Sequence, residues 1–95
     1  MLDVFKGEGA KLLIDAIIAT NNEEDCKKLL EDMMTTREIL TMAQRMEVVK
    51  LLREGKSYVE IGEKTGASTA TISRVNRYYT YGNDGYKKVF EKIDK

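Results

Sequence analysis

The chain has 95 residues, which is enough for one domain and too few for two of ordinary size. Its 16 Lys and Arg residues balance 16 Asp and Glu residues, so any binding to nucleic acid or a membrane surface must come from a local patch. With no histidine and one cysteine, Cys26, it lacks the ligand sets of zinc sites, the imidazole of Ser-His-Asp hydrolases and an internal disulfide. We therefore expect a single domain over residues 1–95 in the reducing cytoplasm, with no catalytic residue, no metal and no cofactor.

The first predicted helix is unusually apolar. Its pattern of apolar residues has the spacing of one helix face and consists of Ala10, Leu13, Ile14, Ile17 and Ile18. Leu12, Ala16 and Ala19 extend the apolar surface around much of the helix, which is uncommon on a small monomer. We expect a second chain to cover it. The longest apolar stretch, Leu12–Ala19, is too short for a membrane span, which needs roughly 18 residues.

Capping residues divide the rest of the chain into helices. Asn21 or Asn22 is a candidate N-cap for a second helix, which carries the apolar positions Cys26, Leu29, Leu30, Met33 and Met34. This spacing assigns the Cys26 thiol to packing. The capping-box pair Thr35 and Glu38 begins a longer helix that Gly55 ends.

A second capping box, Ser57 with Glu60, begins a short predicted helix that runs to about Thr65, because Gly66 breaks it. Ser68 then caps another helix, which is expected to end before the turn formers of residues 81–85. A final helix is predicted from about Asp84 to Ile93.

The segment at about residues 57–79 has the pattern of a DNA-binding helix-turn-helix. The two helices of that motif cross closely, so the first needs a small residue, here Gly62, and a left-handed turn residue follows at Gly66. Buried apolar side chains must then join the helices, and the required positions are held by Ile61, Ala67, Ile72 and Val75. Agreement at all of these spacings predicts the motif.

The outward face of the second helix suits a major groove. It is small or hydroxylated at its start and basic farther on, and Gly66–Tyr81 contains two arginines and no acidic residue. With Ser57 and Ser68 at helix ends that favour phosphate, the candidate DNA contacts are Ser57, Ser68, Thr69, Ala70, Thr71, Ser73, Arg74 and Arg77. The alternative is that the serines only cap and the arginines are solvated.

Residues 66–74, of sequence GASTATISR, resemble the recognition segment of the Trp repressor. The wider run from Ala43 to Tyr86 is more similar to the Trp repressor-related YerC/YecD family of bacterial proteins, and the resemblance is looser before Asn22. It implies an all-α, six-helix Trp repressor-like fold that forms an intertwined homodimer. The two helices of the helix-turn-helix would read DNA, and the other four would form the shared core.

The resemblance also implies an effector pocket. In the Trp repressor, arginines hold the carboxylate of tryptophan, and a glycine lies beside its ring. Arg74 matches one such arginine, whereas Gln44 stands at the second position with Arg45 beside it, so a shift of one residue stays open. Val75 replaces the glycine, and its branched side chain would fill the space of the indole. We expect no use of tryptophan and leave the effector unassigned.

The leading hypothesis is a homodimeric, sequence-specific transcriptional regulator, a repressor, whose partner is double-stranded DNA and which has no membrane partner. The alternative is a homodimeric protein-interaction module whose helix-turn-helix does not read DNA, which the zero net charge favours. A group of tyrosines follows the recognition helix and is assigned to dimer packing in preference to stacking on single-stranded bases. Its members are Tyr78, Tyr79, Tyr81 and Tyr86.

Overall fold

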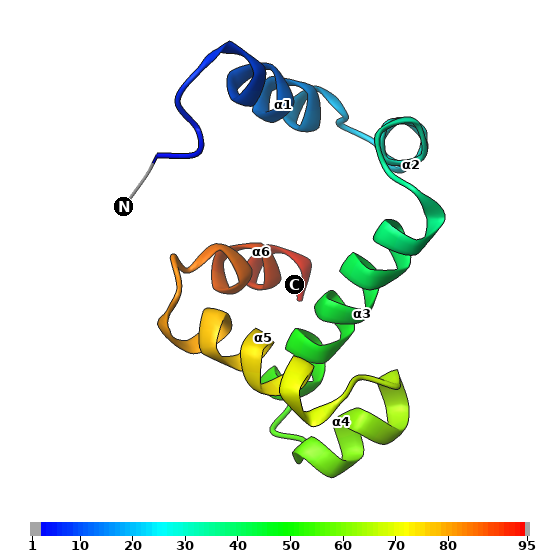
Figure 1. The fold of residues 1–95 in the computed structure, drawn as a ribbon, viewed down its shortest axis with the longest axis vertical. Coiled ribbons are helices and arrows are strands. Elements are labelled where there is room, and N and C mark those ends of the chain that lie inside the picture. Colours follow the sequence, from blue (N-terminus) through cyan, green and yellow to red (C-terminus); the bar gives the residue numbers. More distant parts are fainter. Residues whose placement is uncertain (1–2, 95) are drawn as a thin grey trace. The chain divides into compact units, whose positions relative to one another are not determined.

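The computed structural model describes residues 3–94, and its elements in that range are six helices and no strand (Figure 1). They are α1 (Glu8–Ala19), α2 (Glu23–Met33), α3 (Thr36–Arg53), α4 (Tyr58–Thr65), α5 (Thr69–Tyr81) and α6 (Gly85–Ile93). The predicted all-α class and the predicted order of helices are confirmed. One boundary differs, because α5 includes Tyr81, which the sequence placed in the following turn. The contacts within the chain divide it into two compact units, which meet between Ile39 and Leu40.

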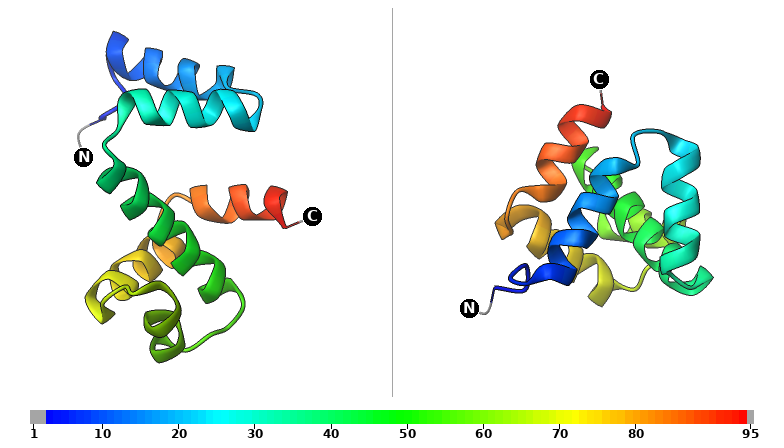
Figure 2. Two further views of the ribbon diagram at one scale, coloured as in Figure 1. Left: turned by 90° about the vertical axis from the view of Figure 1, so that its right-hand side faces the viewer. Right: turned by 90° about the horizontal axis from the view of Figure 1, so that it is seen from above.

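The first unit contains α1, α2 and the beginning of α3. Asn22 caps α2, because its side chain accepts a hydrogen bond of 2.9 Å from the backbone N–H of Asp25. Figure 2 shows α1 and α2 joined by the short connection that contains this cap. Neither helix has a buried residue. The apolar side chains of α1 are therefore not buried within this unit.

The capping box at the start of α3 forms as the sequence predicts. The backbone N–H of Thr35 donates to the Glu38 carboxylate at 2.9 Å, and the backbone N–H of Glu38 donates to the Thr35 hydroxyl at 3.1 Å. The hydrogen bonds that Thr35 donates lower the pKa of the Glu38 carboxyl below its ordinary value, because they favour the charged form.

The second unit has a continuous hydrophobic core. Its fully buried side chains come from three helices and are Val48 and Val49 of α3, Ile61 of α4 and Ile72 of α5. Phe90 of α6 joins the same cluster. The helix-turn-helix formed by α4 and α5 therefore shares one core with the end of α3 and with α6. Close packing of this kind fixes the orientation of α4 and α5.

Two glycines shape the corners around α4. Gly55 has φ 78°, and the backbone N–H groups of Gly55 and Lys56 donate to the carbonyls of Leu52 and Leu51, which closes α3. Gly66 has φ 75° and ψ 3°, and its N–H donates to the carbonyl of Gly62 at the end of α4. Both residues adopt the left-handed conformation, which side chains disfavour.

Gly62 has a different role, because its backbone is helical. A methyl group added there would lie 3.4 Å from the carbonyl oxygen of Ala67 and 3.9 Å from Cδ1 of Ile72, which is ordinary contact. The crossing of α4 and α5 therefore requires a small residue at this position, and alanine fits as well as glycine.

The two glycines of the helix-turn-helix should respond to the same substitution in opposite ways. Gly66→Ala should lower the free energy of unfolding by about 1–2 kcal/mol, because alanine is strained in the left-handed conformation. Gly62→Ala should be neutral or stabilising by up to about 1 kcal/mol, because alanine favours the helix. Urea unfolding of both variants measures this difference. Equal destabilisation by the two substitutions would contradict the assigned roles.

Candidate nucleic-acid interface

The hydroxyl groups at the starts of α4 and α5 form hydrogen bonds within the chain. Ser57 Oγ accepts from the backbone N–H of Glu60 at 3.2 Å and donates to the Glu60 carboxylate at 3.3 Å. Ser68 Oγ accepts from the backbone N–H of Thr71 at 3.1 Å and donates to the Thr71 hydroxyl at 3.0 Å. Three of the hydroxyls predicted to contact DNA therefore have internal partners. The carboxylate of Glu60 also places negative charge at the beginning of α4.

From its first residue to Arg77, α5 presents a face that the chain does not cover. Thr69, Ser73 and Arg77 recur every four residues and lie on one side of the helix, with Ala70 and Arg74 beside them. All five side chains are exposed. Within residues 3–94, neither Arg74 nor Arg77 has a salt-bridge partner. The face therefore combines small groups at the N-terminal end with two unpaired positive charges.

A cavity of about 560 Å³ lies on the other side of Arg74. Its wall comes from α3, α5, α6 and the turn before α6, and the lining residues are Arg45, Met46, Arg74, Val75, Tyr78, Gly82, Asn83, Gly85, Tyr86 and Val89. Arg45 and Arg74 thus line one cavity without an acidic residue. Gln44 is absent from its wall, because its side-chain amide donates to the Thr65 carbonyl at 3.1 Å. Of the three residues proposed for an effector pocket, the structure brings two together.

Arg53 holds α6 in place against the end of α3. Its guanidinium lies 3.1 Å from the Asp94 carboxylate and 5.5 Å from the centre of the Phe90 ring. Burial opposes the charge, but hydrogen bonds and charges of Tyr79 and Asp94 raise the pKa of Arg53 above its ordinary value. The guanidinium thus joins the end of α3 to α6, and α6 forms one wall of the cavity.

Several residues of the interface were missed by the sequence reasoning. Tyr58 of α4 and Asn76 of α5 are joined by a hydrogen bond of 3.1 Å. Tyr78 and Tyr86 were assigned to dimer packing as a group, and the structure places both on the cavity wall. The sequence could have indicated the role of Gly82 at the end of α5, since this residue begins a group of turn-forming residues. A Cβ there would collide with the backbone carbonyl of Tyr78.

Fold and site together define an all-helical protein built around a helix-turn-helix. The chain belongs to the Trp repressor family, because the family model described as Trp repressor protein matches residues 8–94. Its relatives place it in the Trp repressor-related group that includes YerC. This is a family of regulators and not of enzymes.

Three relatives show how closely the chain follows this family. It is 41% identical over 92 residues to the uncharacterised protein YerC of Bacillus subtilis strain 168, which covers 97% of this chain and 88% of YerC. A TrpR-like protein from Eubacterium eligens ATCC 27750 is 49% identical, with a TM-score of 0.91 over 95% of this chain and 93% of that one. A candidate Trp repressor from Staphylococcus aureus is 38% identical, with a TM-score of 0.89 over 95% and 90%.

Two absences fit this assignment without adding to it. No helix between residues 3 and 94 is long and apolar enough to cross a membrane. The same residues contain no group of three or more histidine, cysteine, aspartate or glutamate side chains placed to hold a metal ion.

Proposed function

We propose that this protein is a sequence-specific DNA-binding transcriptional regulator that acts as a homodimer, with repression as the expected outcome. The observation that carries the proposal is the packed pair of α4 and α5, whose left-handed turn at Gly66 leaves the outer face of α5 free. Membership in the Trp repressor family supports a DNA-binding regulator.

Thr69, Ala70 and Ser73 are the proposed base contacts. Their small side chains let the N-terminal half of α5 approach base edges, where a methyl group can touch thymine and a hydroxyl can hydrogen-bond. Arg74 and Arg77 supply the charge for phosphates or guanine edges. Ser57, Ser68 and Thr71 contribute by fixing the helix ends, because their hydroxyls already have partners within the chain.

The homodimer is proposed from the uncovered surface of the first unit. Leu12 and Ile18 of α1 are 63% and 72% exposed, and none of the twelve residues of α1 is buried. Large exposed apolar patches on a small protein mark a surface that another chain covers. A two-fold dimer would carry two copies of α5, suited to half-sites about one helical turn apart, roughly 34–36 Å.

A protein-interaction module is the second candidate function. The zero net charge of the chain and the exposed Val59 on α4, which is 70% accessible, favour it. Salt separates the two functions. DNA binding releases counterions, so its affinity must fall steeply as ionic strength rises, whereas apolar protein contacts change little.

The chain should sediment as a dimer at micromolar concentration. No residue of α1 is buried, and pairing with a second copy would remove its apolar side chains from water. Analytical ultracentrifugation measures the mass directly. A species at the monomer mass of 10.8 kDa would contradict the homodimer.

Two substitutions on α5 should have different effects on DNA binding. Arg77→Ala should weaken binding to all sequences and lower the slope of affinity against salt by about 1, because one phosphate contact is lost. Thr69→Ala should change the preference among sites and keep the salt slope. Fluorescence anisotropy with several duplexes over a range of salt concentrations measures both effects.

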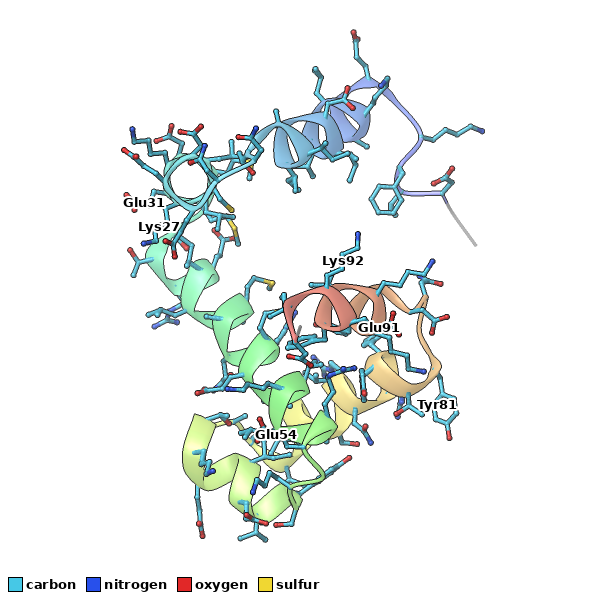
Figure 3. The ribbon with its side chains drawn as sticks, turned by 180° about the vertical axis from the view of Figure 1, so that it is seen from behind. Lys27, Glu31, Glu54, Tyr81, Glu91 and Lys92 are labelled. Atoms are coloured by element: carbon cyan, nitrogen blue, oxygen red, sulfur yellow. The ribbon has the colours of Figure 1, made fainter. Side chains whose placement is uncertain are left out.

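The matched control is Lys92→Ala, which removes a positive charge that projects from α6 (Figure 3). It should bind like the parent. If Arg77→Ala and Thr69→Ala also bind like the parent, α5 is not the element that reads DNA.

The cavity is the proposed effector site, with Arg45 and Arg74 as the groups that would hold an acidic ligand. Its volume of about 560 Å³ is within the usual range for small-molecule sites. Size alone therefore does not exclude tryptophan. The exclusion rests on Val75, which is 4% exposed and forms part of the wall where the family has a glycine beside the ring. Gln44 is hydrogen-bonded to Thr65, so the second arginine of the cavity is Arg45.

Free L-tryptophan should not act as a corepressor. Its ring should overlap the Val75 side chain, which is buried in the wall and leaves no room for both. Calorimetric titration with L-tryptophan, alone and with DNA present, tests this prediction. Micromolar binding, or DNA affinity that depends on tryptophan, would show that Val75 leaves room for the ring.

A further inference from the structure

A directed chain of hydrogen bonds crosses from α5 to α4 on the exposed side of the helix-turn-helix. The Thr80 hydroxyl donates to Asn76 Oδ1 at 3.2 Å, and Asn76 Nδ2 donates to the Tyr58 hydroxyl oxygen at 3.1 Å. Each donated proton points one step nearer to Tyr58. The phenol of Tyr58 is the last member of this series of hydrogen bonds, and its oxygen acts as an acceptor.

The proton of the Tyr58 hydroxyl has no acceptor in the described part of the chain. A phenol accepts through its oxygen and donates its own proton at the same time, so the bond from Asn76 leaves the donor unused. Accepting a hydrogen bond polarises the O–H group and makes it a stronger donor. Tyr58 is 37% exposed, so an acceptor outside the chain can reach it.

The position of this donor indicates which acceptor it meets. Tyr58 is the first residue of α4, and Asn76 lies between the buried Ile72 and the exposed Thr69 in the helical rotation of α5, at the edge of its uncovered face. In helix-turn-helix complexes the second helix enters the major groove, and the first crosses the sugar-phosphate backbone. A donor at the junction of the two helices therefore meets phosphate oxygens before it meets bases.

We propose that Tyr58 donates its hydroxyl proton to a phosphate oxygen of the DNA backbone and that Asn76 is the positioning residue that aims it. This inference rests on the proposed function. The Glu60 carboxylate lies at the Ser57 cap of α4 and repels a phosphate from the backbone N–H groups there, so the contact is placed at the Tyr58 hydroxyl.

Tyr58→Phe removes the hydroxyl, which is both the proposed donor to phosphate and the acceptor of the bond from Asn76, and keeps the ring. DNA affinity should fall by at least about threefold for every sequence, because a hydrogen bond to a charged phosphate is lost. The salt slope should stay unchanged, because no charge is removed. Asn76→Ala should weaken binding in the same way but less. The control is Tyr81→Phe, which removes the same group from a side chain that extends from the end of α5 and is 85% exposed (Figure 3).

Replacing single phosphates by uncharged methylphosphonates locates the contact. With the parent protein, replacing the contacted phosphate in each half-site should weaken binding more than replacing any other phosphate. With Tyr58→Phe, replacing that same phosphate should weaken binding no more than the other replacements do. Tyr81→Phe should keep the parent pattern. The inference is overturned if Tyr58→Phe binds as tightly as the parent, or if its loss is the same whichever phosphate is replaced. A parent protein that binds no DNA would instead contradict the proposed function.

Discussion

The left-handed backbone at Gly66 is the constraint on which the rest of the structure depends. With φ 75° it ends α4 and turns the chain so that α5 packs back across α4. Ile72 and Val75 are thereby buried against Ile61, and this contact is continuous with Val48 and Val49 of α3. The inner face of α5 packs into this core, and its outer face is left exposed. One backbone conformation therefore determines both the core and the candidate reading surface.

The polar groups of the interface divide by their position along the helices. Hydroxyls at helix ends, such as those of Ser57 and Ser68, satisfy backbone N–H groups and stabilise the motif. Ser73, Arg74 and Arg77 lie one turn or more into α5, are exposed and have no such role. Arg74 has a further distinction, because it lies on the exposed face and also lines the cavity. The two candidate sites are thus joined through one guanidinium.

Local signals in the sequence predicted most of the fold. The caps at Asn22, Ser57 and Ser68 and the turn at Gly66 act over three or four residues, so they can be recognised without knowledge of tertiary structure, and the structure has them all. The burial of Ile61 and Ile72 followed from the same short pattern. Helix boundaries were correct to within one or two residues for the same reason.

Contacts between distant residues could not be predicted in this way. Whether Gln44 or Arg45 lines the cavity depends on the rotation of α3 against α5, and a linear comparison cannot give that angle. The bond between Tyr58 and Asn76 spans 18 residues and depends on how α4 crosses α5. The sequence indicated which residue types were available, and the packing of the helices decided which of them meet.

The central claim is that a pair of α5 helices reads DNA in a two-fold arrangement, and footprinting of the tagged protein on its own genome tests it most directly. The account predicts a limited set of protected sites, each containing two inverted half-sites whose centres are about one helical turn apart. Protected sites without two-fold symmetry would contradict the arrangement. A complete lack of protection above background, with the protein folded and present, would contradict DNA reading itself.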